Sequence, residues 1–152
     1  MLTDARQQRA EAVVARLTAG DPQLRVKVQV LTTDAVCAFA WPNRTIYVTR
    51  GLMDRADDDV LAAALAHEMG HLLSDGRARS FASLKGCDQN ADAEVRADAY
   101  GVALLRAKHV PTDSMTRMLR LVRDSNTLAP DCRRAMDHRI ELLIAIPKSS
   151  QN

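Results

Sequence analysis

The sequence predicts an α+β fold in which a small antiparallel sheet of three strands packs on a helical bundle. Three observations lead to this prediction. One stretch alternates strictly between polar and apolar residues, two short β-rich runs flank a Pro-Asn-Arg turn, and apolar residues elsewhere recur at helical spacing. The chain has 152 residues and shows neither an internal repeat nor a low-complexity linker, so we expect one domain spanning residues 1–152.

The expected strands lie in the first third of the chain. Arg25–Leu31 reads Arg-Val-Lys-Val-Gln-Val-Leu, an alternation typical of a strand with one solvent-exposed face. Val36–Trp41 and Thr45–Thr49 are rich in β-branched and aromatic residues, and Pro42-Asn43-Arg44 between them is typical of a hairpin turn. Gly51 is expected to end the β region.

Helical patterns surround these strands. An amphipathic helix is expected from about Thr3 to Ala19. A second helix should begin after the capping residues Asp57-Asp58-Asp59 and end near Gly76, and its alanine-rich interior would let another element approach closely. The remaining expectations are a surface loop at Arg77–Gln89, helices at about Asn90–His109, Thr112–Asp124 and Asp131–Ile146, and a frayed tail at Lys148–Asn152.

Composition excludes two classes of function. Lys and Arg number 21 against 19 Asp and Glu, which gives a net charge of +2, and the aromatic residues are 2 Phe, 2 Tyr and 1 Trp. The chain therefore lacks both the basic surface and the stacking residues of a dedicated nucleic-acid binder. Because no stretch approaches the ~20 apolar residues that cross a bilayer, we expect a soluble protein without a transmembrane segment.

The N-terminus and the cysteines leave the cellular compartment open. Met1–Arg9 carries charges with no apolar run after them, which does not fit a secretory signal peptide. If a leader was removed, an extracytoplasmic or periplasmic location is favoured, and otherwise a cytoplasmic one. Cys37, Cys87 and Cys132 suffice either for one disulfide and one thiol or for three buried thiols.

Residues 67–71, His-Glu-Met-Gly-His, match the pattern H-E-x-x-H inside the strongest helical segment. His67 and His71 are one turn apart on one helix face, so both imidazoles can bind the same zinc ion. Glu68 then lies beside the metal, where its carboxylate can take a proton from a zinc-bound water and pass it to a leaving amine. We expect one Zn²⁺ per chain, with Glu68 as a catalytic residue.

A third ligand is expected from the following helix. The stretch Glu94-Val95-Arg96-Ala97-Asp98 places two carboxylates one turn apart. Glu94 is predicted to complete the zinc site, and Asp98 to hold a ligand imidazole from behind and fix its tautomer, that of His67 in particular. Such a pair taken alone is more often a solvated acidic face. The H-E-x-x-H motif upstream favours the metal interpretation.

The combination of H-E-x-x-H with a helix carrying E-x-x-A-D is similar to the gluzincin zinc metallopeptidases. Its details resemble the HtpX-like family, which includes membrane and periplasmic quality-control peptidases and the CAAX prenyl proteases. Ala38–Pro42 is similar to the family's A-F-A-x-P, Ile46–Leu52 to its strand and T-x-G-L, and Ala62–His71 to its L-A-A-V-L-A-H-E-I-G-H. The resemblance covers about Val36 to Ala107 and implies a zincin-like catalytic domain without the family's transmembrane helices.

The chain departs from the family pattern in two places. Cys37 stands where the family usually has Asn, and no His-Pro pair precedes Arg139. Arg139 is expected either at the site, as a catalytic residue that stabilises the oxyanion, or in solvent. If the helices that follow Cys87 and Cys132 both close on the site, as the resemblance implies, these two cysteines can meet in a disulfide.

The expected reaction is hydrolysis of peptide bonds in extended or unfolded polypeptide, in protein quality control. The substrate is expected to pair with Val36–Trp41 as the edge of the sheet. Two alternatives stay open. One is a zinc-containing binding or chaperone-like module, whose structural zinc would need a fourth protein ligand, and the other is a regulatory protease that cuts one transcription factor. A latent enzyme, blocked by its own termini or by a second copy in an edge-paired homodimer, is also open.

Overall fold

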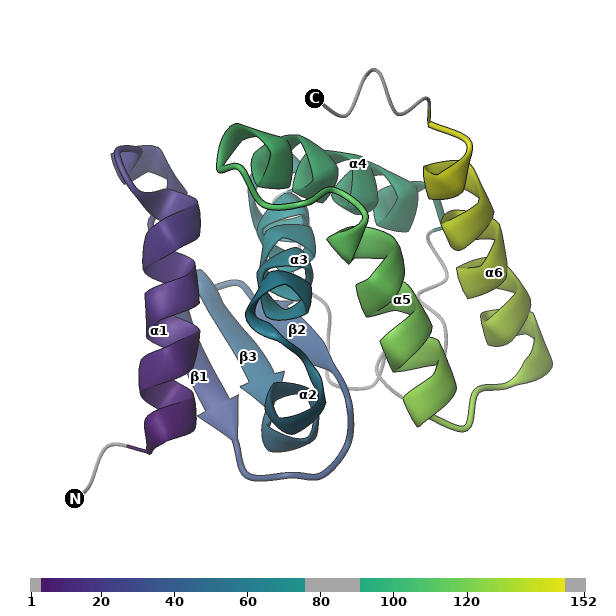
Figure 1. Cartoon of the computed structure of the whole chain (residues 1–152), viewed down its shortest axis with the longest axis horizontal. Coiled ribbons are helices and arrows are strands. Elements are labelled where there is room, and N and C mark those ends of the chain that lie inside the picture. Colours follow the sequence, from purple (N-terminus) through teal and green to yellow (C-terminus); the bar gives the residue numbers. More distant parts are fainter. Residues whose placement is uncertain (1–3, 76–90, 147–152) are drawn as a thin grey trace.

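The computed structural model describes residues 4–75 and 91–146, so the expected loop at Arg77–Gln89 and the tail at Lys148–Asn152 lie outside the described residues. One helix and a 3-10 turn precede three consecutive strands, and helices alone follow (Figure 1). The elements are α1 (Ala5–Thr18), a 3-10 turn (Pro22–Leu24), β1 (Lys27–Leu31), β2 (Ala38–Trp41), β3 (Thr45–Thr49), α2 (Arg50–Arg55), α3 (Asp58–Gly70), a π-helical turn (His71–Asp75), α4 (Ala91–Ala107), α5 (Ser114–Ser125) and α6 (Pro130–Ile144).

The α+β class is confirmed, but the sheet is mixed rather than antiparallel throughout. β2 and β3 form the expected antiparallel hairpin, with Phe39 opposite Tyr47. β1 pairs with β3 in parallel, with Val28 opposite Ile46, which corrects the expectation for this strand. The strand order β1-β3-β2 explains the difference. β1 and β3 run in the same direction, and β2 runs opposite to both. Because β1 lies beside β3 rather than beside β2, its pairing is parallel.

A short helix, α2, follows β3 directly and was not predicted from the sequence. The Thr49 hydroxyl caps it by accepting a hydrogen bond from the Leu52 N–H at 3.2 Å. The Gly51 N–H donates to the Thr33 carbonyl at 3.0 Å, so the loop between β1 and β2 passes over the start of α2. A Cβ on Gly51 would overlap the carbonyl oxygens of Asp34 and Ala35, which explains the glycine at this position.

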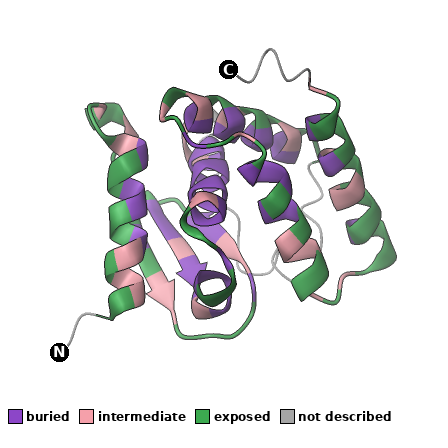
Figure 2. Cartoon of the chain, in the orientation of Figure 1, coloured by how far each residue is buried: buried purple, intermediate pink, exposed green. Residues whose placement is uncertain are grey.

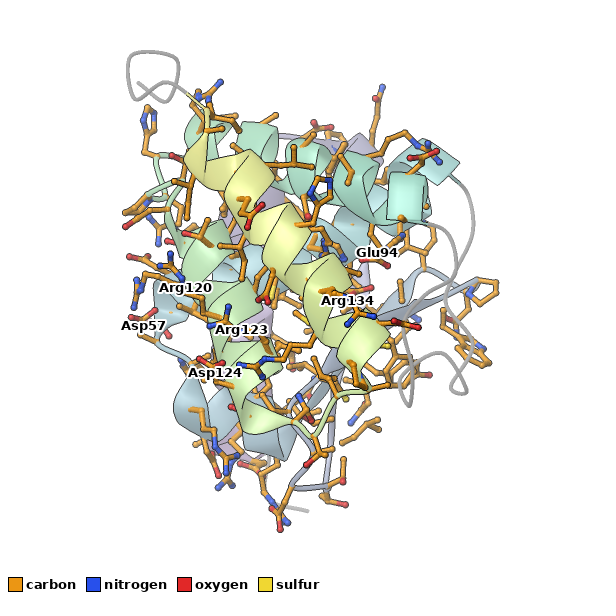
Figure 3. The ribbon with its side chains drawn as sticks, turned by 90° about the vertical axis from the view of Figure 1, so that its right-hand side faces the viewer. Asp57, Glu94, Arg120, Arg123, Asp124 and Arg134 are labelled. Atoms are coloured by element: carbon orange, nitrogen blue, oxygen red, sulfur yellow. The ribbon has the colours of Figure 1, made fainter. Side chains whose placement is uncertain are left out.

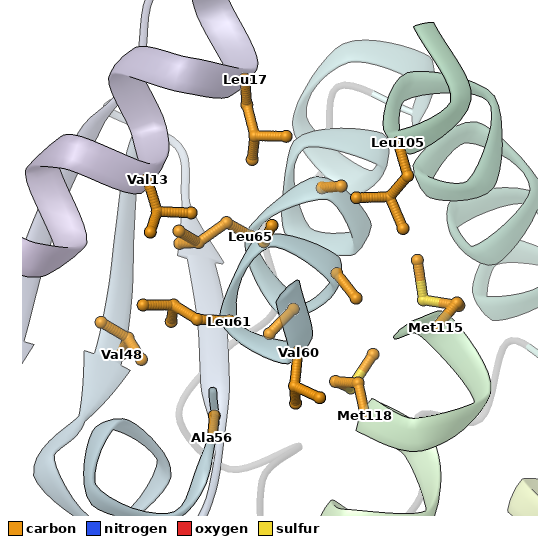
Figure 4. Close-up of a cluster of buried hydrophobic side chains, with 14 of the residues drawn as sticks. Val13, Leu17, Val48, Ala56, Val60, Leu61, Leu65, Leu105, Met115 and Met118 are labelled. Atoms are coloured by element: carbon orange, nitrogen blue, oxygen red, sulfur yellow. The ribbon is translucent and has the colours of Figure 1, made fainter. Parts of the chain in front are cut away.

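Helix α3 runs through the centre of the molecule. Asp57 caps it by accepting a hydrogen bond from the Val60 N–H at 2.8 Å, and every residue from Val60 to Gly70 is buried (Figure 2). A helix that is buried on all sides needs partners on all sides. Figure 4 shows them: side chains of α1, β3, α4 and α5 converge on α3, among them Val13, Leu17, Val48, Leu105, Met115 and Met118 around Leu61 and Leu65.

Glycines let the backbones of α3 and α4 approach each other. A Cβ on Gly70 would lie 2.9 Å from the Cα atom of Ala97, and a Cβ on Gly101 would lie 3.2 Å from the backbone nitrogen of His67. Larger residues at either position would push the two helices apart. The close approach brings the carboxylates of α4 to the histidines of α3.

Helices α5 and α6 lie on the other side of α3 from α1 (Figure 1). Arg123 of α5 forms an ion pair with Asp137 of α6 at 2.9 Å. It also pairs with its neighbour Asp124 at 2.8 Å (Figure 3). This pair of helices forms one wall of the cavity described below. In the part of the chain that the structure describes, no helix has the length and apolar character needed to cross a membrane.

Candidate metal centre

His67 and His71 present their imidazoles to one point, as residues four apart on a helix do. Their Nε2 atoms lie 3.2 Å apart, and the two rings meet nearly at right angles. Both side chains are buried. The α-helix ends at Gly70, and His71 begins the π-helical turn, a rare local widening that is often found at functional sites.

Glu94 of α4 reaches the same point from the neighbouring helix. Its Oε2 lies 3.1 Å from His67 Nε2, and its Oε1 lies 3.1 Å from His71 Nε2. One ligand atom from each of the three residues lies within 4.8 Å of the others. A buried carboxylate needs a charged or hydrogen-bonding partner, and here the two imidazoles surround it. The structure thus brings together the three residues that the sequence singled out as metal ligands.

Asp98 contacts the opposite side of the His67 ring. Its Oδ1 lies 2.8 Å from His67 Nδ1. A proton on Nδ1 that is donated to Asp98 leaves the Nε2 lone pair directed at His71 and Glu94. Burial lowers the pKa of His67, but hydrogen bonds to Asp98 and Glu94 outweigh this effect and raise the pKa to about 9. A metal that binds Nε2 must therefore displace a proton.

Arg139 reaches the same carboxylates from α6. Its Nε and Nη2 atoms each lie 2.8 Å from an oxygen of Asp98, and Nη2 lies 3.3 Å from Glu94 Oε2. Burial raises the pKa of Asp98, but the hydrogen bonds from Arg139 and His67 outweigh it and hold that pKa below its usual range. This two-point contact favours a role for Arg139 in positioning the carboxylates over the expected contact with an oxyanion.

Glu68 is buried beside the cluster and opens onto a cavity. Its Oε1 lies 3.9 Å from His67 Nε2, and only 2 % of the residue is exposed. His67 and Glu68 line a cavity of about 370 Å³, a volume that suits a small-molecule or side-chain site. The rest of its wall is mostly apolar, and β2, α5 and α6 contribute to it with residues that include Phe39, Met118, Leu119, Val122 and Met136.

The model of peptidase family M48 matches residues 2–91, which is more than half of the chain. The chain belongs to peptidase family M48. The matched stretch of this M48 peptidase contains the H-E-x-x-H residues and ends before Glu94. The assignment of Glu94 to the metal cluster therefore rests on the positions of its atoms in the structure. No curated protein matches the sequence.

The donor set of this M48 chain fits zinc, on which the peptidases of the family depend. Two imidazole nitrogens and one carboxylate oxygen are a ligand set of catalytic zinc, which keeps a fourth position open for water or substrate. Among the described residues, His67, His71 and Glu94 are the only group of His, Cys, Asp or Glu side chains whose geometry could hold a metal. The closed site of a structural zinc would require a further protein ligand.

Sequence reasoning missed the wall that α5 contributes. Asn126, at the end of α5, lines the cavity and binds the segment before β2, but a single Asn after a helix gives no signal in the sequence. Of the cysteines, Cys132 is disulfide-bonded and Cys37 is present as a thiol that lines the cavity. Cys87 lies outside the described residues, so its bridge to Cys132 stays a prediction.

Proposed function

We propose that this M48 metallopeptidase is an endopeptidase that holds one zinc per chain and cuts extended or unfolded polypeptide, in protein quality control. One observation carries the proposal: the donor atoms of His67, His71 and Glu94 lie within 4.8 Å of one another, beside Glu68 and the cavity that it lines. Two imidazoles, a carboxylate ligand and a separate buried carboxylate are the parts that metal-assisted hydrolysis of a peptide bond requires.

Glu68 is the proposed general base and acid. Zinc bound at His67, His71 and Glu94 would supply a Lewis acid that polarises the scissile carbonyl and lowers the pKa of water toward 7. Glu68 would take the proton of the attacking water and donate it to the leaving amine. Its carboxylate is buried beside the donor cluster but is not part of it.

Asp98 and Arg139 are the proposed supports of the ligands. The contact between Asp98 and His67 Nδ1 selects the tautomer whose Nε2 can bind a metal. Arg139 binds both Asp98 and Glu94, so it offsets their negative charge and holds two residues of α4 in place. Both residues would act through the ligands rather than on the substrate.

The proposed substrate lies extended along β2. The order β1-β3-β2 makes β2 an edge of the sheet among the described strands, and Cys37, Ala38 and Phe39 line the cavity beside Glu68. An extended peptide can add to a sheet edge through backbone hydrogen bonds, while alternate side chains enter pockets. This mode of binding recognises backbone more than sequence, and it requires a segment that is free of secondary structure.

Mass spectrometry of the cleavage products tests this proposal. The zinc-loaded protein is incubated with a reduced and alkylated test protein and with the native form of the same protein, and Glu68→Gln is treated identically. We expect internal cuts in the unfolded form and little or no cleavage of the native form. Products trimmed only from a chain end would contradict endopeptidase activity. Equal cleavage of both forms would contradict the preference for unfolded polypeptide.

A further inference from the structure

Asn126 connects two walls of the cavity. This residue follows the last turn of α5, and its side-chain Nδ2 donates to the Val36 carbonyl at 2.9 Å and to the Val122 carbonyl at 2.7 Å. Val36 comes just before β2, 90 residues earlier in the sequence. Because Asn126 also lines the cavity with Glu68, one amide group joins the α5 wall to the strand wall.

The two contacts fix which way the amide is turned. A carbonyl oxygen can only accept, so the NH₂ group of Asn126 must face Val36 and Val122, and the carbonyl oxygen Oδ1 must face elsewhere. Both amide hydrogens are then used. Within the described residues, no donor reaches Oδ1. Asn126 therefore retains one acceptor whose orientation is set by the protein itself.

The pairing pattern of β2 shows where this amide lies relative to the sheet edge. The Cys37 carbonyl accepts from the Thr49 N–H at 3.1 Å, and the Trp41 carbonyl accepts from the Arg44 N–H at 3.0 Å, so these positions direct their backbone groups toward β3. Backbone direction alternates along an antiparallel strand, which turns the Val36 carbonyl toward the outer edge. The Asn126 amide thus donates to Val36 as the N–H of a further strand would.

We propose that Asn126 is a substrate-binding residue whose Oδ1 accepts a backbone N–H of the extended peptide at the Val36 end of β2. This inference rests on the proposed function, because it requires a peptide along this edge. A peptide that runs along β2 meets the Asn126 amide where strand pairing ends. An amide oxygen accepts a backbone N–H whatever side chain follows, which suits a site that reads backbone rather than sequence.

A set of N-methylated peptides tests the proposal. One peptide that the zinc-loaded wild type cleaves is made in versions that each carry a single N-methyl group in place of a backbone hydrogen, and kcat/KM is measured for each. Methylation of the one backbone N–H that binds Asn126 Oδ1 should lower kcat/KM of the wild type about 5- to 10-fold through loss of one hydrogen bond. In Asn126→Ala, the unmethylated peptide should lose about the same factor, and methylation at that position should have no further effect.

Two more variants check the result obtained with Asn126→Ala. Asn126→Leu fills a similar space without an acceptor and takes the place of Asn126→Ala if the alanine variant does not fold. Asn126→Asp keeps an oxygen acceptor but places its second oxygen against the Val36 and Val122 carbonyls, which repel it, so it should lose the wild-type sensitivity to methylation at that one position. Thermal melts and zinc content of each variant show whether the fold and the metal centre are retained.

Equal methylation profiles in the wild type and in a folded Asn126 variant would overturn the proposal and leave the proposed function intact, because cleavage itself would still occur. A zinc-loaded wild type that cleaves no peptide would overturn both. The two failures are therefore distinguishable.

Discussion

Gly70 of α3 lies so close to Ala97 of α4 that a Cβ on Gly70 would come within 2.9 Å of the Ala97 Cα atom. Glu94 and Asp98 lie on either side of Ala97 in the sequence, and both contact His67. The distance between the two helix backbones therefore sets the distance between the imidazoles and the carboxylates.

Gly70→Ala should move Glu94 away from the histidines. The added methyl group would overlap α4, and overpacking of this kind costs about 1–3 kcal/mol of stability. We expect a lower melting temperature and weaker zinc binding, measured by competition with a chelator of known affinity. Ala99→Ser, on the exposed face of α4, is the matched control and should change neither. Unchanged zinc affinity in Gly70→Ala would contradict this account of the helix contact.

Asp98→Ala should weaken zinc binding without removing a ligand. Loss of a group that orients a ligand imidazole lowers metal affinity about 10- to 100-fold, and Asp98 lies 2.8 Å from His67 Nδ1. Asp92→Ala removes an exposed carboxylate from the first turn of the same helix and serves as the control. If both variants bind zinc equally well, the contact between Asp98 and His67 has no part in metal binding.

Removal of the metal should destabilise the wild type. A metal that binds only the folded chain adds about 2.7 kcal/mol of stability at a free concentration 100 times its Kd. We expect a chelator to lower the melting temperature and added zinc to restore it. In Glu94→Gln, which lacks one of the three proposed ligands, the difference between the two conditions should be much smaller. A zinc-dependent shift as large as that of the wild type would exclude Glu94 as a ligand.

Asp57→Ala should destabilise the helix that carries the histidines. Loss of an N-cap side chain costs about 1 kcal/mol, and Asp57 accepts from the Val60 N–H at 2.8 Å. Asp113 precedes α5 but makes no side-chain capping hydrogen bond, so Asp113→Ala is a matched control and should cost much less. Denaturant unfolding of the two variants at neutral pH measures the difference.

The effect of Asp57→Ala should also depend on pH. Hydrogen bonds from the Val60 N–H and from Arg117 lower the pKa of Asp57 in the folded chain. A lowered pKa means that the stabilisation is complete above the unfolded-state pKa of about 3.9 and is lost as the pH falls through the folded-state pKa. Wild type and Asp57→Ala should therefore converge in stability once the pH lies below the folded-state pKa of Asp57. A gap that persists unchanged in acid would indicate a cause other than this carboxylate.

The features that local periodicity determines could be predicted from the sequence. Helical geometry alone places His67 and His71 on one face, and it pairs Glu94 with Asp98 in the same way. The hairpin of β2 and β3 follows from the turn residues between them. These elements agree with the structure because their geometry depends on neighbours within a few residues.

Features that depend on distant parts of the chain could not be predicted in this way. Neither the parallel pairing of β1 with β3 nor the contact of Asn126 with Val36 leaves a periodic pattern in the sequence. Helix α2 is six residues long, too short for a periodic signal. The sequence left Arg139 either at the site or in solvent, and its two-point contact with Asp98 depends on where α6 lies in the fold.

Glu68 is proposed to perform proton transfer beside a zinc ion that it does not bind. The most direct test measures zinc content by elemental analysis, together with cleavage of unfolded casein, in the wild type and in Glu68→Gln. We expect one zinc per chain in both proteins and cleavage by the wild type only. Loss of zinc in Glu68→Gln would contradict the assignment of Glu68 as a residue outside the ligand set, and full activity in that variant would contradict its role as the base.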